Sequence, residues 1–189
     1  MRIVTIATLF SLAALPAMAT DYQAAMHSYL ENNIRSWAQS PVLVEAIATQ
    51  NSETQGLDQA AVDALDTKWR AEVGSGATPT IDDVLQNAAA DFLRAQINES
   101  GGRITEVFIM DAQGLNVASS GVTSDMWQGD EAKFQQTYSV GADASHFGDV
   151  ELDESSRRYQ AQISLTIVDA ASGAAIGAMT VGIDAEALM

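Results

Sequence analysis

The chain has 189 residues, which fits one domain with its own hydrophobic core, and carries a formal net charge of −16. This charge repels nucleic acids and anionic membrane surfaces, because phosphate binding requires cationic side chains. The sequence contains no cysteine, which excludes disulfides, thiolate metal sites and a cysteine nucleophile.

The first nineteen residues have the features of a secretory signal peptide. Arg2 gives a positive start, residues 3–15 form an apolar run too short to span a bilayer, and Ala17-Met18-Ala19 suits cleavage. We expect residues 1–19 to be removed on export and residues 20–189 to form a single domain in the periplasm of a Gram-negative cell. A membrane-anchoring first helix is the less favoured alternative.

Residues 21–99 are predicted to form the helical part of the domain. Apolar residues recur there at helical spacing, and Ser40-Pro41 and the Gly-rich residues 74–79 separate the segments. In the first helix the apolar stripe comprises Tyr22, Met26, Tyr29 and Trp37. The pattern predicts helices over residues 21–40, 42–50, 58–73 and 80–97.

Residues 103–184 are predicted to form the sheet part, because the apolar period changes to two. A turn at Asp111-Ala-Gln-Gly114 joins the first two strands, and residues 140–154 read as an acidic loop with room for a short edge strand around Val150. Helices followed by an antiparallel sheet indicate an α+β fold with the helices on one sheet face. The pattern predicts strands over residues 104–110, 115–119, 159–168 and 175–183, and a short helix within residues 131–138.

Four segments together resemble a known family. They are EVFIMDAQGLNVASS, DMWQGDE, YQAQISLTIVD and GAAIGAMTVGID, and in this order they are similar to the periplasmic Cache domains, also called PDC domains, which are PAS-like sensors. The resemblance implies N-terminal helices packed on one face of an antiparallel PAS-like sheet. Family members are usually joined by transmembrane helices to a kinase, chemoreceptor or cyclase, so a chain without these parts is expected to act as a standalone exported sensor.

The segment after the second strand holds the first candidates for a ligand site. The indole of Trp127 can stack on a ligand or face a cation, and Asp130 and Lys133 can pair with the opposite charges of a zwitterion such as an amino acid. The resemblance places a segment that closes a pocket at this position. The alternative is that Trp127 fills the core and Asp130 begins a short helix.

Four strand residues are weaker candidates for the same site. Ser119, Gln162 and Ser164 could donate hydrogen bonds from the sheet, and Met110 could line an adaptable pocket. The alternative places the polar residues on the solvent face of a half-buried sheet and the methionine in the core.

Metal binding and catalysis receive little support from the sequence. Asp143, His146 and Asp149 are weak candidates for a cation site, but the Ca²⁺-loop pattern D-x-[DN]-x-[DN]-G is absent and a solvated acidic loop is favoured. Common enzyme motifs such as G-x-S-x-G and H-E-x-x-H are also absent. We therefore predict no metal, no cofactor and no enzymatic activity, and rank a serine hydrolase using Ser119 or Ser120 with His146 last.

Two functional hypotheses follow. The first is a sensor domain that binds a small molecule and presents its ligand state to a membrane-bound sensor kinase or chemoreceptor, through a population shift in the segment from Met126 to Asp149. The second is a protein-interaction or dimerisation module without a ligand, in which the first helix docks on a receptor or on a second copy. An exposed apolar stripe on that helix would favour the second hypothesis.

Overall fold

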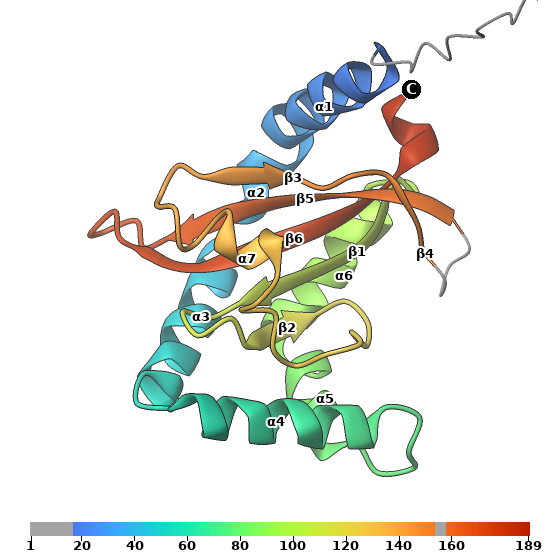
Figure 1. Cartoon of the computed structure of the whole chain (residues 1–189). Helices are drawn as coiled ribbons and strands as arrows, with labels where there is room; N and C mark the ends of the chain where they lie inside the picture. Colours follow the sequence, from blue (N-terminus) through green and yellow to red (C-terminus); the bar gives the residue numbers. More distant parts are fainter. Residues whose placement is uncertain (1–16, 154–157) are drawn as a thin grey trace, which may run out of the picture.

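A computed structural model describes residues 17–153 and 158–189 (Figure 1). The predicted signal peptide falls mainly on residues 1–16, which lie outside the described residues, so its removal stays a prediction. Among the described residues, no helix combines the length and the apolar character that a membrane crossing requires.

The first half of the described chain is helical, as predicted. The predicted first helix forms as three consecutive pieces, because a π-helical turn lies in its middle. Asp58 caps the helix that begins at Gln59 by accepting a hydrogen bond from the backbone N–H of Ala61 at 2.9 Å. The helical elements are α1 (Ala17–Tyr29), η1 (Leu30–Ile34), α2 (Arg35–Ala38), α3 (Pro41–Thr54), α4 (Gln59–Glu72), α5 (Pro79–Leu85) and α6 (Ala88–Glu99).

The second half forms an antiparallel sheet in the order β2-β1-β6-β5-β3, with β4 also paired to β5. The predicted α+β fold with a PAS-like sheet is confirmed. Residues 140–154 contain two short strands where one was allowed for, because the long strand β5 has backbone groups to satisfy along its outer edge. The elements are β1 (Ile104–Met110), β2 (Asn116–Ser119), α7 (Ala132–Gln135), β3 (Ser145–Phe147), β4 (Glu151–Asp153), β5 (Arg158–Val168), β6 (Ala175–Asp184) and η2 (Ala185–Leu188).

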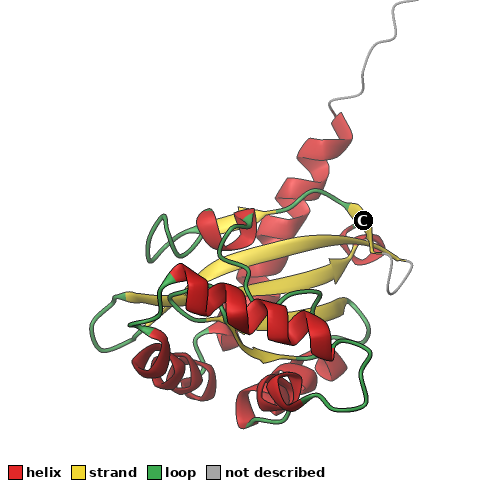
Figure 2. Ribbon diagram, turned by 60° about the horizontal axis from the view of Figure 1, so that its bottom comes forward, coloured by secondary structure: helices red, strands yellow, loops and turns green. Residues whose placement is uncertain are grey.

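Helices α3 and α6 cover one face of the sheet and form the main core with it (Figures 1 and 2). Strand β5 contributes alternate residues to this core, namely Ala161, Ile163, Leu165 and Ile167, all almost fully buried. Its intervening residues point to the opposite face, as the period of two predicts. The stripe of the first helix also joins this core through Met26 and Tyr29, with Leu30 and Ile34 beside them.

The opposite face of the sheet is only partly covered. The short helix α7 lies over it, and Phe134 packs there on Phe108, Met110 and Ala178. Under this helix the hydroxyls of Ser164 and Thr180 lie 3.0 Å apart and are fully buried. The remainder of this face, toward the start of β5, is not covered by α7.

The predicted fourth helix over residues 80–97 is in fact two helices, α5 and α6. Asn87 between them has extended backbone and accepts a hydrogen bond from the N–H of Ala90 at 2.9 Å, which begins α6. Its side-chain amide donates to the carbonyls of Val84 at 3.2 Å and Val117 at 3.1 Å. One side chain therefore ends α5, starts α6 and fixes both to β2.

The D-x-x-G turn forms as predicted and is tied to α3. Asp111 is fully buried and accepts hydrogen bonds from the backbone N–H groups of Gln113 and Leu115, both at 2.9 Å. Its other oxygen accepts from Gln50 at 3.0 Å and from the hydroxyl of Thr54 at 2.8 Å. The turn thus sets the position of the β1–β2 hairpin against the helical layer.

Candidate functional site

A cavity of about 840 Å³ lies on the part of the sheet face that α7 leaves uncovered. Its floor is formed by β1 and β5, and its walls by α7, by the β3–β4 segment and by the chain after β2. A volume of this size is typical of small-molecule sites. The residues that line it are Val73, Glu106, Phe108, Val122, Thr123, Ser124, Gln128, Glu131, Ala132, Lys133, His146, Gly148, Asp149, Glu151, Leu152, Gln160 and Gln162.

The floor combines one carboxylate with two side-chain amides. Glu106 and Gln162 both pair in register with Gly182 of the strand between them, so the three residues form one row across the sheet. Glu106 accepts a hydrogen bond from Gln162 at 3.3 Å and from Gln160 at 3.5 Å. A Cβ at Gly182 would lie 2.7 Å from the Cγ of Glu106, so only glycine leaves room for these polar groups to meet.

Lys133 forms the wall on the α7 side. Its side chain is 14% exposed, and its ammonium lies 3.0 Å from Oε2 of Glu131. The same ammonium donates to the side-chain oxygen of Gln128 at 3.3 Å and lies 5.4 Å from the centre of the Phe108 ring. These contacts compensate the loss of water around a largely buried cation.

The opposite wall and the mouth are more exposed. His146 and Gly148 of the β3–β4 segment are half-buried there, whereas Asp149 and Glu151 point to solvent. Three apolar side chains surround the mouth and are about half exposed: Val73 (46%), Val122 (53%) and Leu152 (52%). The cavity therefore has a polar floor and a rim of both apolar and acidic side chains that remains in water.

The chain after β2 forms part of the wall and is fastened to α4. The indole N–H of Trp69 donates to the carbonyl of Thr123 at 2.8 Å. Asp66 accepts from the backbone N–H of Met126 at 2.9 Å and of Trp127 at 3.1 Å. Arg70 adds an ion pair to Asp125 at 2.7 Å. A displacement of this wall would therefore be passed to α4.

The structure brings two of the predicted ligand-binding residues together, and they are Lys133 and Gln162. Trp127 lies in a second core cluster with Trp69 and Met126, and its indole N–H donates to the carbonyl of Gln113 at 2.9 Å. This arrangement matches the alternative in which Trp127 fills the core.

Asp130 lies on the surface and does not line the cavity. Its carboxylate contributes to a raised pKa of Arg70, for which the hydrogen bond with Asp66 is the largest cause, followed by the charge of Asp125. The zwitterion site predicted from Trp127, Asp130 and Lys133 is thus not assembled in this geometry.

The three remaining strand candidates are buried away from the cavity. The hydroxyl of Ser119 donates to the carbonyl of Gly121 at 2.6 Å, and Ser164 is bonded to Thr180. Met110 packs under α7. The sequence predicted which face of the sheet Ser164 occupies, but not that α7 covers this position.

The weak metal candidates do not converge. Asp143 and Asp149 are exposed, and His146 pairs in the sheet with Ser164. Within residues 17–153 and 158–189, no group of three or more His, Asp or Glu side chains is arranged to hold a metal ion.

The hydroxyls of Ser119 and Ser120, which were considered as hydrolase nucleophiles, form hydrogen bonds with the backbone. That of Ser120 accepts a hydrogen bond from the backbone N–H of Val107 at 2.9 Å, and that of Ser119 donates to Gly121.

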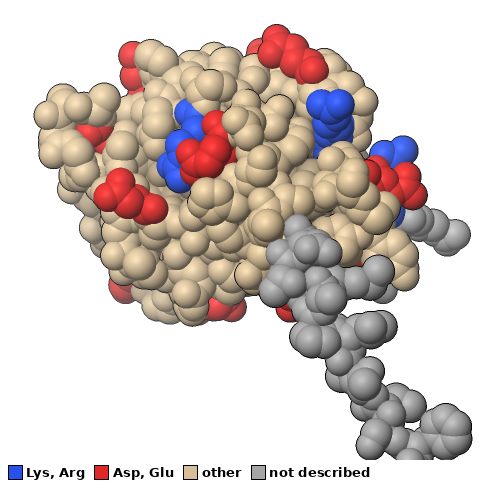
Figure 3. Space-filling model, turned by 90° about the horizontal axis from the view of Figure 1, so that it is seen from above, with Lys and Arg blue, Asp and Glu red and all other residues tan. Residues whose placement is uncertain are grey.

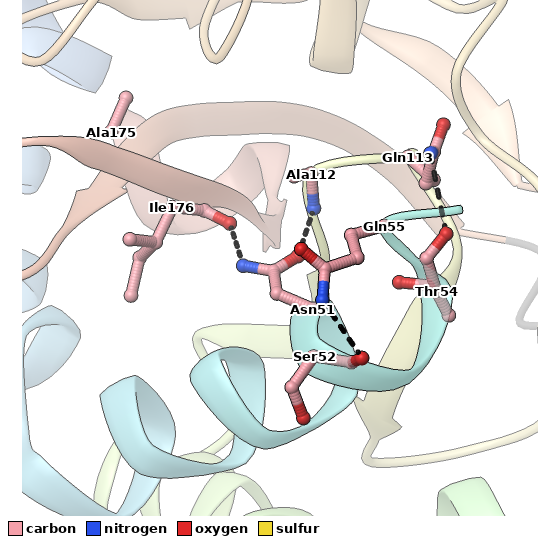
Figure 4. Close-up of a pocket in the computed structure, with 8 residues that line it drawn as sticks. All are labelled: Asn51, Ser52, Thr54, Gln55, Ala112, Gln113, Ala175 and Ile176. Carbon is pink, nitrogen blue, oxygen red and sulfur yellow. Dashed lines mark hydrogen bonds between the residues drawn. The ribbon is translucent and has the colours of Figure 1, made fainter. Parts of the chain in front are cut away.

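A smaller hollow of about 300 Å³ lies between α3, the β1–β2 turn and the start of β6 (Figure 4). Its polar groups are already paired with one another. Asn51 donates to the carbonyl of Ile176 at 2.7 Å and accepts from the N–H of Ala112 at 2.8 Å, and Gln113 donates to the carbonyl of Thr54 at 3.4 Å. This hollow joins α3 to the sheet and is a weaker candidate for a ligand site than the large cavity.

Sequence reasoning missed Glu106, Phe108 and Gln128 as lining residues. Glu106 had a recognisable signal, because it is the only charged residue of β1 and shares the face of Phe108 by strand alternation. Gln128 had no local signal, since its position depends on the path of an irregular segment.

Comparisons with protein-family models and with curated proteins gave no match. Solved structures do match. The sensor domain of the V. cholerae histidine kinase DctB is 18% identical, with a TM-score of 0.39 over 88% of this chain and 58% of that chain. The ligand-binding domain of the Campylobacter jejuni chemoreceptor Tlp3, solved with 4-methylisoleucine, is 13% identical, with a TM-score of 0.43 over 89% of this chain and 62% of that chain.

The E. coli DcuS sensor domain is 11% identical, with a TM-score of 0.47 over 89% of this chain and 95% of that chain. The chain thus spans less than two thirds of the first two structures, but nearly all of the third. All three are sensor domains or ligand-binding domains, the class of protein predicted from the sequence. At these identities and TM-scores, the matches assign no ligand, partner or activity to this chain.

Proposed function

We propose that this chain is a sensor domain that binds a small molecule in the cavity formed by β1, β5, α7 and the β3–β4 segment. The observation that carries the proposal is the cavity itself, with about 840 Å³ of space and side chains from β1, β5, α7, the β3–β4 segment and the chain after β2 converging on it. A polar floor of Glu106, Gln160 and Gln162 would orient a ligand, and the apolar side chains of the rim could close over it.

Signalling would follow from a change in the wall after β2. Thr123, Ser124 and Gln128 line the cavity, and the same segment is hydrogen-bonded to α4 through Asp66 and Trp69. A ligand that prefers one position of this wall would shift its population, and α4 would move with it. We infer that a membrane-bound sensor kinase or chemoreceptor in the periplasm reads this change.

The interaction-module hypothesis has less support. It requires an apolar stripe exposed on the first helix, but Met26 is 2% exposed and Tyr29 is 9% exposed against the chain's own core. Tyr22 and Trp37 are half-buried beside the same core. This leaves little apolar surface on that stripe for a receptor or for a homodimer.

A thermal-shift screen of the protein tests the proposed function. The library contains amino acids, small carboxylates, amines, purines and divalent metals. A ligand at a hundred times its Kd raises the free energy of unfolding by about 2.7 kcal/mol, which moves Tm by a few degrees. The shift should disappear in Gln162→Trp, which places an indole on the cavity floor, and persist in Gln135→Trp on the exposed side of α7.

Two results would contradict the proposal. One is the absence of any shift across the library with folded protein. The other is a shift that survives the obstruction of the cavity floor by Gln162→Trp, because the compound would then bind elsewhere.

A further inference from the structure

The charges around the cavity are strongly unequal. Among the described residues that line it, four carry carboxylates and one carries an ammonium; the carboxylates are Glu106, Glu131, Asp149 and Glu151, and the ammonium is that of Lys133. Water is partly excluded from the floor of a concave site, so the charge of the half-buried Glu106 acts more strongly on a ligand than a charge on an open surface, whereas Asp149 and Glu151 act from the exposed mouth.

The ammonium of Lys133 already has partners within the protein. Lys133 has an ion pair with Glu131 at 3.0 Å, a hydrogen bond to Gln128 at 3.3 Å and the face of Phe108 at 5.4 Å. An incoming anion would have to displace Glu131 and would then face the other carboxylates. A cation would instead be attracted by Glu106 in the floor and by Asp149 and Glu151 at the mouth.

The rest of the protein reinforces this local preference. The chain has nine Lys and Arg against twenty-five Asp and Glu, and its field attracts cations from solution. On the face shown in Figure 3, Lys and Arg form only scattered groups, with Asp and Glu near them.

The apolar lining adds a second requirement. Phe108 lies in the floor, and Val73, Val122 and Leu152 surround the mouth. A bare metal ion would gain nothing from these side chains, and the described residues offer no group of ligands to hold one. A molecule with a cationic group and a short hydrocarbon part would use both the carboxylates and the apolar surface.

We propose, building on the proposed sensor function, that the ligand of this cavity is a small aliphatic amine rather than a carboxylate or an amino acid. Its ammonium groups would pair with the carboxylates of the floor and the rim, and its methylene groups would lie against the apolar side chains. Lys133 then serves to hold Glu131 and α7 in place and does not contact an anionic ligand group.

Calorimetric titration of the protein with putrescine and with succinate tests this inference. Both probes have a four-carbon chain and two charges, but the charges have opposite sign. We expect binding of putrescine that weakens as ionic strength rises, and no binding of succinate. Glu106→Gln should weaken putrescine binding by about tenfold, and Glu151→Gln at the exposed mouth by about threefold.

Glu53→Gln is the matched control, because Glu53 is exposed on α3 and lines a different groove. It changes the net charge by the same amount and should leave the Kd unchanged. Glu151 is itself exposed, so its variant stays informative even if Glu106→Gln disturbs the fold.

The outcomes separate this inference from the proposed function. Preferential binding of succinate, or of a zwitterion that is lost in Gln162→Trp, would overturn the amine assignment and leave the sensor function standing. An equal loss of putrescine affinity in Glu53→Gln would overturn it as well, because binding would then follow net charge alone. If neither putrescine nor succinate binds and no compound of the screening library shifts Tm, both proposals are overturned.

Discussion

The two faces of the sheet differ in composition although the same strands build both. Toward α3 and α6, strand β5 presents Ile163 and Leu165, which are almost fully buried in the main core. Toward the cavity it presents Gln160 and Gln162, which are half-buried and bonded to Glu106. One face forms the main core, and the other keeps polar groups on the floor of the cavity.

The difference also explains why the cavity stays open. Burial of apolar area drives helices onto the first face, at about 25 cal/mol per Å². On the second face a covering helix would have to dehydrate carboxylates and amides without providing partners for them. Helix α7 therefore covers only the part of this face where Phe108, Met110 and Ala178 are apolar and where the hydroxyls of Ser164 and Thr180 satisfy each other.

Neighbouring residues of β5 give the most direct test of this comparison. Ile163→Ala leaves a void in the main core and should lower the free energy of unfolding by about 3 kcal/mol. Gln162→Ala, one residue away on the cavity face, removes a single partly exposed hydrogen bond and should cost less than about 1 kcal/mol. Urea denaturation of both variants gives the two values.

If Gln162→Ala lowers the free energy of unfolding as much as Ile163→Ala does, the two faces do not differ as described, because the cavity face would then be part of the core. An unchanged m-value in both variants serves as the control that the native and unfolded states keep their compactness.

The turn that joins β1 to β2 should give the next largest effect. Asp111→Ala leaves the buried N–H groups of Gln113 and Leu115 without their acceptor and should cost about 2 kcal/mol. Asp169→Ala in the turn between β5 and β6 is the matched control. There Asp169 accepts from Ala171 and Ser172 at the surface. Equal losses of Tm in the two variants would show that burial of the turn is not what matters.

The helical pair α4–α5, next to the cavity mouth, should show a pH-dependent stability. Burial opposes ionisation of Glu72, but hydrogen bonds from the Thr80 hydroxyl and from the N–H groups of Ile81 and Thr80 outweigh it, so the pKa is lowered from its ordinary 4.5. A lowered folded pKa contributes stability above the unfolded pKa and loses it as pH falls through the folded pKa.

Glu72→Gln tests this effect, because its amide N–H₂ would face N–H donors. We expect a lower Tm than wild type at neutral pH and a difference that shrinks as pH falls below about 4.5. A Tm difference that stays constant down to strongly acidic pH would contradict the assignment to ionised Glu72. The hydrogen bonds of Glu72 lie between α4 and α5, so Glu72→Gln should leave the packing of the main core unchanged.

Much of the fold could be predicted from local pattern. The period of two placed Ile163 and Gln162 on opposite faces, and the Asp111 turn followed from a side chain that bonds its own backbone. The break at Asn87 was missed, because its carbonyl acceptor at Val117 belongs to a strand that lies far along the chain. Helical periodicity continues through such a break and cannot reveal it.

The candidate site was less predictable for a related reason. Lys133 and Gln162 reach the cavity, but Trp127 does not, because Asp66 on α4 holds its backbone and turns the segment toward the second core cluster. Such long-range bonds decide the path of an irregular segment. Glu106 was accessible to reasoning, since a charged residue in an otherwise apolar central strand requires a polar environment on its face.

The smallest effect on stability, and the sharpest on binding, is expected at Lys133. Its partner Glu131 is 39% exposed and can be hydrated once the ammonium is gone, and glutamine keeps a polar group beside Gln128, so Lys133→Gln should change the free energy of unfolding by less than about 1 kcal/mol. The substitution removes the one ammonium among the described lining residues and frees Glu131 for a ligand. If the cavity face selects amines, putrescine should bind this variant several-fold more tightly than wild type. If Lys133 instead receives an anionic ligand group, binding of that ligand should be lost, and calorimetry on this one variant distinguishes the two cases.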